Sequence, residues 1–171
     1  MRFLDVLMDE HRGFIAMLDV LDAVAARLVS GREVPTPMVA DVRAARAFLK
    51  TRREAIPGRV GSAGASIGAN LAILAAAADS TVRSLALLSP GTDYRGLRPE
   101  AAIKKYGDRP ALIIASQEDT YATGSARQLA VAGAGPGIGI RELRILRGAG
   151  HGAAMLAREP DLASSLVDWF R

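Results

Sequence analysis

The sequence predicts an α/β fold: a short parallel sheet of about four strands, flanked by helices and preceded by a long amphipathic helix. Three observations support this prediction. From Arg59 onward, short apolar segments alternate with longer helical segments, an order typical of parallel sheets. Residues 111–115 are apolar at every position, as expected for a strand buried on both faces. Residues 2–31 instead carry apolar side chains at alternating spacings of three and four, which is typical of one helical face.

Two helices are expected before the first strand. The first covers residues 2–31, and its apolar stripe consists of Leu4, Leu7, His11, Phe14, Leu18, Leu21, Ala25 and Leu28. Gly31 is expected to end it. Thr36 then serves as an N-cap, with Pro37 in the first turn of a second helix that extends to about Glu54. The residues that this second helix is expected to bury are Val39, Val42, Ala45, Phe48 and Leu49.

Strands and helices are expected to alternate after residue 59. The predicted strands are Val60–Ala65, Ser84–Leu88, Ala111–Ala115 and Ile140–Leu146, and the predicted helices are Ile67–Ala78, Pro99–Tyr106, Ala122–Ala132 and Asp161–Phe170. Strands joined by crossover helices run parallel, so their carboxyl ends lie along one edge of the sheet. The loops that follow the strands are therefore expected to converge at that edge.

Length and composition fit a single domain with a sizeable core. The chain has 171 residues and half of them are hydrophobic, yet no apolar run approaches the ~18–20 residues that span a membrane. The first five residues carry charges where a signal peptide needs an apolar stretch. Cysteine is absent, so disulfides and thiolate metal sites are not expected. These features predict a cytoplasmic protein without a membrane partner.

The net charge of +4 raises the question of a nucleic-acid partner. Most of the basic residues are arginine, and they are scattered among acidic ones, with Arg52-Arg53 and Lys104-Lys105 the only adjacent pairs. Aromatic residues, which stack on bases, make up only 5% of the chain. The pattern therefore predicts a solvated basic surface and no nucleic-acid partner.

A Gly-x-Ser-x-Gly motif, Gly64-Ala65-Ser66-Ile67-Gly68, lies between the first predicted strand and the helix that follows it. This pattern is typical of a nucleophile elbow, a sharp strand-to-helix turn that exposes the serine hydroxyl. Asp119 follows the strand at 111–115, and His151 follows the strand at 140–146. The three side chains are thus expected at one edge of the sheet, in the chain order Ser, Asp, His that this kind of fold uses.

Each of these residues also has a plain structural interpretation. Ser66 could be only an N-cap, Asp119 could cap the next helix with Glu118 as a rival acid, and His151 could be a surface residue. The combination favours catalysis, because the chain has two histidines and one falls where the chemistry needs it. In that hypothesis Ser66 attacks an acyl carbon, His151 moves the proton and Asp119 orients the histidine. The backbone N–H of Ile67 would stabilise the oxyanion.

From about residue 36 to the end, the chain resembles bacterial α/β-hydrolases of the dienelactone hydrolase and esterase type. The matching segments are Asp41-Val42-Arg43-Ala44-Ala45 through Phe48-Leu49, Gly64-Ala65-Ser66-Ile67-Gly68-Ala69-Asn70, Leu87-Leu88-Ser89-Pro90-Gly91, Ser116-Gln117-Glu118-Asp119-Thr120-Tyr121 and Gly150-His151-Gly152. The resemblance implies a serine carboxylesterase that cleaves small activated esters through an acyl-enzyme and needs no cofactor. In such enzymes the loop at 92–107 often shapes the acyl pocket. Tyr94, Leu97 and Tyr106 could line that pocket or simply pack on the sheet.

The N-terminal segment departs from that family. A full α/β-hydrolase has several strands before the elbow, and the loop after one of them supplies a second oxyanion N–H. Here the segment Leu7-Met8-Asp9-Glu10-His11-Arg12 resembles the first helix of hemerythrin-like domains, in which the matching histidine binds iron. The other ligands of that site have no counterpart, so no metal is expected and His11 is interpreted as a packed residue. The expected organisation is a fusion, with an N-terminal helix at 1–35 and a truncated α/β-hydrolase core at 36–171.

This organisation has consequences for assembly and activity. The strand at 60–65 would lie at the sheet edge, and the helix at 2–31 would present an apolar stripe. Either surface could support a homodimer, which is the expected assembly. A missing oxyanion donor would weaken catalysis. The alternative function is therefore a weak or silent hydrolase scaffold with no physiological substrate.

Overall fold

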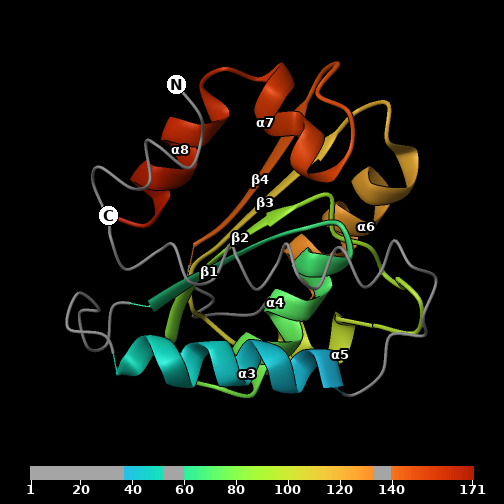
Figure 1. Cartoon of the computed structure of the whole chain (residues 1–171). Coiled ribbons are helices and arrows are strands. Elements are labelled where there is room, and N and C mark those ends of the chain that lie inside the picture. Colours follow the sequence, from blue (N-terminus) through green and yellow to red (C-terminus); the bar gives the residue numbers. More distant parts are fainter. Residues whose placement is uncertain (1–36, 52–59, 133–139) are drawn as a thin grey trace.

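The structure, a computed structural model, describes residues 37–51, 60–132 and 140–171. Its centre is a four-stranded sheet with the order β1-β2-β3-β4, in which all neighbouring strands are parallel. The strands are β1 (Val60–Ala65), β2 (Val82–Leu88), β3 (Ala111–Ser116) and β4 (Arg141–Leu146). The predicted α/β fold with a short parallel sheet is confirmed (Figure 1).

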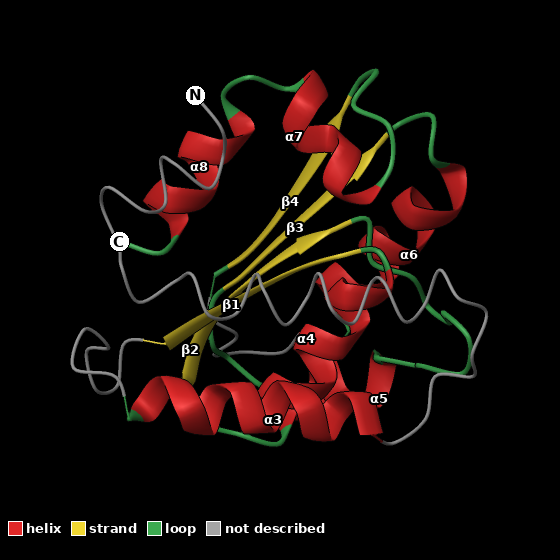
Figure 2. Ribbon diagram, viewed as in Figure 1, coloured by secondary structure: helices red, strands yellow, loops and turns green. Residues whose placement is uncertain are grey.

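Helices cover both faces of this sheet (Figure 2). The helices are α3 (Pro37–Lys50), α4 (Ile67–Ala77), α5 (Glu100–Tyr106), α6 (Thr120–Val131), α7 (Met155–Arg158) and α8 (Leu162–Trp169), with a 3-10 turn η1 (Gly152–Ala154) before α7. One apolar core joins α4, α5 and α6 to the sheet, and a second joins α7 and α8 to the opposite face. The helix α3 packs on α4, outside the first core.

The sequence explains why the centre of the sheet is the most deeply buried part. Every residue of β3 is buried, which fits the uninterrupted apolar run at residues 111–115. The helix α4 buries alanines along its length, and these small side chains let its backbone approach the strands closely. Burial of these apolar surfaces on both faces provides the main driving force for the fold.

The second predicted helix is shorter than expected. It ends at Lys50 rather than near Glu54, because the hydroxyl of Thr51 donates a hydrogen bond to the carbonyl oxygen of Phe48 at 2.7 Å and closes the helix in a turn. The predicted burial of Phe48 is also wrong, since its side chain is 54% exposed. The buried face of this helix carries Val42, as predicted, and also Arg46, which lies one helical turn further on.

Several predictions concern residues outside the described ranges. The helix at 2–31, its hemerythrin-like resemblance, the role of His11 and the boundary at residue 35 all fall there, and the predicted homodimer stays a prediction. Among the helices of the described ranges, none is long and apolar enough to cross a membrane.

Candidate active site

Ser66 occupies a strained turn between β1 and α4. Its backbone has φ 54° and ψ −124°, a conformation that side chains rarely adopt. The turn is possible because Gly64 has no side chain: a Cβ there would lie 2.3 Å from the carbonyl oxygen of Gly68. The N–H of Ser66 donates to the carbonyl of Leu88 at 2.8 Å, which fixes the turn to β2. The predicted elbow motif therefore forms a sharp strand-to-helix turn with a steric basis.

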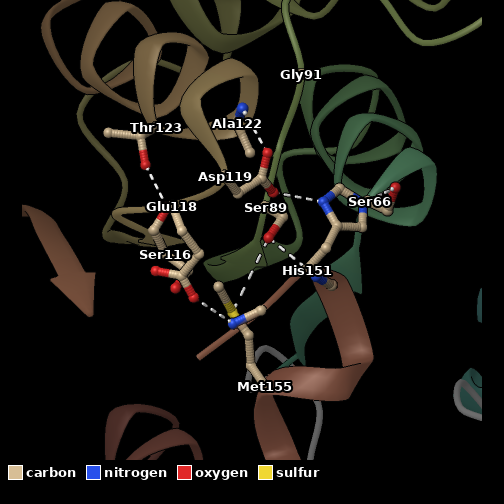
Figure 3. Close-up of polar contacts among 12 residues, drawn as sticks. Ser66, Ser89, Gly91, Ser116, Glu118, Asp119, Ala122, Thr123, His151 and Met155 are labelled. Carbon is tan, nitrogen blue, oxygen red and sulfur yellow. Dashed lines mark hydrogen bonds and ion pairs between the residues drawn. The ribbon is translucent and has the colours of Figure 1, made fainter. Parts of the chain in front are cut away.

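The structure brings Ser66, Asp119 and His151 together at the carboxyl edge of the sheet (Figure 3). His151 Nε2 lies 2.7 Å from Ser66 Oγ, and His151 Nδ1 lies 2.5 Å from Asp119 Oδ2. The Ser66 side chain makes no capping hydrogen bond to α4, so the interpretation as a simple N-cap does not describe its contacts. Its hydroxyl is directed to the imidazole instead.

Asp119 has both of the roles that the sequence left open, because it caps a helix and also pairs with the histidine. Its Oδ1 accepts a hydrogen bond from the N–H of Ala122 at 3.2 Å and so caps α6, while its Oδ2 pairs with His151. The helix cap fixes the carboxylate, and the fixed carboxylate orients the imidazole. The Asp119 side chain is 16% exposed and that of His151 is 48% exposed, so the acid is sheltered and the histidine is open to solvent.

Glu118, the rival acid, binds the histidine loop rather than the histidine. Its two carboxylate oxygens accept hydrogen bonds from the N–H groups of Gly148 and Gly150, each at 3.0 Å. A hydrogen bond with the Ser116 side chain, followed by those backbone bonds, lowers the pKa of Glu118 to about 2. Glu118 therefore stays ionised and holds the backbone on both sides of the turn that leads to His151.

Two buried serines hold the same loop from inside the sheet. Ser116 Oγ accepts a hydrogen bond from the N–H of Ala149 at 2.9 Å. Ser89 Oγ accepts one from the N–H of Gly152, also at 2.9 Å, and donates to the sulfur of Met155. Sequence reasoning missed both roles. The available signal was position: Ser116 ends β3 and Ser89 directly follows β2, at the edge where the loops converge.

The loop after β2 is attached to the elbow helix by Asn70, one turn beyond Ser66. The fully buried amide of Asn70 donates to the carbonyls of Gly91 and Leu97 at 2.9 and 2.8 Å, and its oxygen accepts from the N–H of Gly91 at 3.0 Å. On the other side, the Tyr121 hydroxyl of α6 donates to the carbonyl of Asp93 and accepts from its N–H. The loop therefore has a defined position beside Ser66.

The three predicted pocket residues have different positions. Tyr94 lies at the site, with its ring edge-on to His151 at a centroid distance of 6.4 Å. Leu97 is half-buried in the same loop, and its lining role stays a prediction. The prediction is wrong for Tyr106, which is 2% exposed and donates to the carbonyl of Pro110, just before β3. Because α5 leads back to the amino edge of the sheet, Tyr106 packs in the core at the opposite end.

Ile67, the predicted oxyanion donor, is the first residue of α4. The first N–H groups of a helix have no acceptor within the helix and carry the positive end of its dipole. This N–H follows directly on the nucleophile candidate Ser66. It is therefore available to an anionic oxygen at the elbow.

Comparison with known proteins agrees with this geometry. The model of the dienelactone hydrolase family matches residues 21–165, a range that includes Ser66, Asp119 and His151. The match begins inside the segment 1–35 and gives no support to a hemerythrin-like helix there. No curated protein matches the chain. The family match covers most of the sequence, and the chain therefore belongs to the dienelactone hydrolase family and is a hydrolase.

Proposed function

We propose that this hydrolase is a serine carboxylesterase that cleaves small, activated esters through an acyl-enzyme. The observation that carries the proposal is the continuous hydrogen-bonded line from Ser66 Oγ through the two imidazole nitrogens of His151 to Asp119. A serine hydroxyl is a weak nucleophile until a base removes its proton. The base is here within hydrogen-bond distance of the hydroxyl and has a fixed acid behind it.

In the first step, Ser66 Oγ forms a bond to the ester carbonyl carbon while its proton moves to His151 Nε2. The electron pair of the carbonyl π bond moves to oxygen, and the N–H of Ile67 donates a hydrogen bond to the oxyanion. When the oxyanion collapses, the bond to the leaving alcohol breaks and the alcohol takes the proton from His151. Asp119 stabilises the imidazolium while the proton resides there.

Water then repeats the sequence on the acyl-enzyme. His151 accepts a proton from the water, the hydroxide adds to the acyl carbon, and the Ser66 Oγ–carbon bond breaks as Ser66 regains its proton. The product is a free carboxylic acid. Every proton transfer uses His151 Nε2. The side chains of the site therefore supply all the groups that the mechanism needs, and no cofactor takes part.

The preference for activated esters follows from the exposure of the site. The His151 imidazole is half-exposed, so water weakens the electrostatic stabilisation that a closed site would give. An ester with a good leaving group needs less of that stabilisation, because less negative charge must be neutralised when the bond breaks. Esters with good leaving groups are therefore the expected substrates, and we propose small acyl groups such as acetyl and butyryl.

The test is hydrolysis of p-nitrophenyl acetate and butyrate by the wild-type protein, Ser66→Ala and Ser164→Ala. Ser164 is an exposed serine of α8, whose hydroxyl binds the carbonyl of Asp161, so its variant controls for the loss of a serine hydroxyl elsewhere. We expect Ser66→Ala to lower turnover by about 10³-fold or more, and Ser164→Ala to keep the wild-type rate. Equal background rates in all three proteins would instead favour the silent scaffold.

A further inference from the structure

Tyr94 lies beside His151, the middle residue of the hydrogen-bonded line that we propose for catalysis. Its hydroxyl donates to the carbonyl of Ser89 at 3.2 Å, and the side chain of Ser89 is one of the groups that anchor the histidine loop. Its ring meets His151 edge-on at 6.4 Å and Tyr121 edge-on at 5.6 Å, measured between ring centroids. Contacts with Ser89, Tyr121 and His151 therefore fix the position of the phenol.

The surrounding backbone fixes the position of the Tyr94 ring. A Cβ at Gly91 would lie 2.5 Å from the Tyr94 ring, so the ring packs against bare backbone at that point. The carbonyl and N–H of Tyr94 form a bridge with Leu97 that closes the loop tip. Asn70 then ties this loop to the helix that begins at Ser66. A tyrosine held at so many points is positioned before any substrate arrives.

The hydroxyl of Tyr94 has a proton to donate. Burial raises the pKa of Tyr94 above its ordinary value, and a side-chain hydrogen bond with Ser66 acts in the opposite direction. The phenol therefore stays neutral at physiological pH. Its bond to the Ser89 carbonyl is long, at 3.2 Å, and a neutral carbonyl is a weaker acceptor than an oxyanion.

We propose that Tyr94 is a further catalytic residue, whose hydroxyl donates a hydrogen bond to the oxyanion that forms when Ser66 attacks an ester. This inference rests on the proposed esterase function. The oxyanion forms on the carbon that is bonded to Ser66 Oγ; that oxygen lies 2.7 Å from His151 Nε2, and the Tyr94 ring lies against the same imidazole. The N–H of Ile67 would be the other donor, from the elbow itself.

Within the described ranges, β1 pairs only with β2. Tyr94, in the loop that follows β2, lies beside His151 and offers a side-chain donor from that side of the elbow. The tyrosine keeps its proton throughout: its hydrogen bond shifts from the Ser89 carbonyl to the oxyanion and returns when the oxyanion collapses.

The test is Tyr94→Phe, which removes the hydroxyl and keeps the ring contacts with Tyr121, His151 and Gly91. We expect kcat on p-nitrophenyl acetate to fall by about 10²-fold while KM changes little, because the lost bond exists only in the transition state. The inhibition constant of phenylboronic acid, which forms a tetrahedral adduct with an active serine, should rise by a similar factor. Tyr106→Phe, which removes a hydroxyl in the distant core, should retain the wild-type kcat.

The outcomes separate this inference from the proposed function. Turnover by the wild-type protein that is absent in Ser66→Ala, together with an unchanged kcat in Tyr94→Phe, overturns the role of Tyr94 alone. A rise in KM at constant kcat and an unchanged boronic acid inhibition constant also overturns it, because Tyr94 would then only contact the ground-state substrate. Wild-type turnover no faster than Ser66→Ala overturns both proposals.

Discussion

Asn70 offers the sharpest test of how the loop after β2 is held. Its side chain is fully buried and makes three hydrogen bonds to loop backbone: two to Gly91 and one to Leu97. Asn70→Ala leaves three backbone groups without these partners: the buried N–H and carbonyl of Gly91, and the part-buried carbonyl of Leu97. An unsatisfied buried polar group costs about 1–3 kcal/mol, so the two groups of Gly91 together should lower the free energy of unfolding by roughly 2–6 kcal/mol.

Asn70→Asp provides a matched variant of the same shape. The carboxylate can still accept from the N–H of Gly91, but its second oxygen faces the carbonyls of Gly91 and Leu97 where the amide donated. We expect a loss of stability at neutral pH that becomes smaller in acid, since a protonated carboxyl regains one donor. Ser125→Ala, which removes a single acceptor for the N–H of Thr92, should cost less than Asn70→Ala.

The assay is urea unfolding, followed by circular dichroism and by the fluorescence of Trp169, the only tryptophan. The indole of Trp169 donates to the carbonyl of Leu85 in β2, so it reports on the packing of α8 against the sheet. A change of less than about 0.5 kcal/mol in the free energy of unfolding of Asn70→Ala would show that the amide does not hold the loop, because surface substitutions alone produce that much. Such a small change would mean that water satisfies the backbone partners of Asn70 without a loss of stability.

Three further predictions concern the frame around the site. Gly64→Ala should destabilise the fold by about 3 kcal/mol or more, because the new methyl group would overlap backbone, whereas Gly124→Ala, in open space on α6, should stabilise it by about 0.5–1 kcal/mol. The pKa of Glu118 is about 2 in the folded state against an ordinary value of 4.5, so its contribution to stability is present above pH 4.5 and is lost as the pH falls toward 2. Glu118→Gln should therefore make the urea midpoint less dependent on pH in that window. Asp79→Asn removes the carboxylate that lies 2.6 Å from the buried guanidinium of Arg46 and should cost about 2–4 kcal/mol.

Each of these has a contradicting outcome. Equal stabilities of Gly64→Ala and Gly124→Ala would show that the elbow tolerates a side chain. If the urea midpoint of Glu118→Gln falls as steeply with decreasing pH as that of the wild-type protein, other carboxylates cause the acid sensitivity. For Asp79→Asn the control is Asp168→Asn, which breaks an exposed pair with Arg171 and should change stability by less than about 0.5 kcal/mol. Similar losses of stability in Asp79→Asn and Asp168→Asn would show that burial of the Arg46 guanidinium does not increase the contribution of its ion pair.

The parts of the fold that the sequence predicted have local causes. The uninterrupted apolar run of β3 and the alanines of α4 mark buried elements, because apolar side chains without polar positions between them favour packing inside the fold. The convergence of Ser66, Asp119 and His151 followed from topology, since parallel strands place their carboxyl ends at one edge. The elbow followed from sterics, because its glycines remove the atoms that would collide.

The missed features depend on contacts between distant segments. The bonds of Glu118, Ser89 and Asn70 to loop backbone follow no period and no spacing rule. The available signal was only position: Glu118 and Ser89 follow strands, and Asn70 lies in the first turns of α4. Tyr106 was misplaced because it is near the pocket loop in sequence, whereas α5 carries it to the far end of the sheet. The short helix α7 was not predicted, because four residues after a glycine-rich loop show no helical periodicity.

The proposed catalysis requires that Ser66 act as a nucleophile activated by His151. The most direct measurement is mass spectrometry of the intact protein and its peptides after treatment with a fluorophosphonate, which phosphorylates or phosphonylates active serines whatever their natural substrate. Attack by Ser66 Oγ would form the oxygen–phosphorus bond and expel fluoride, while the proton passes to His151. We expect one adduct on the peptide that contains Ser66; it should be absent in Ser66→Ala and form much more slowly in His151→Ala. No adduct, or labelling that persists in Ser66→Ala, would contradict it.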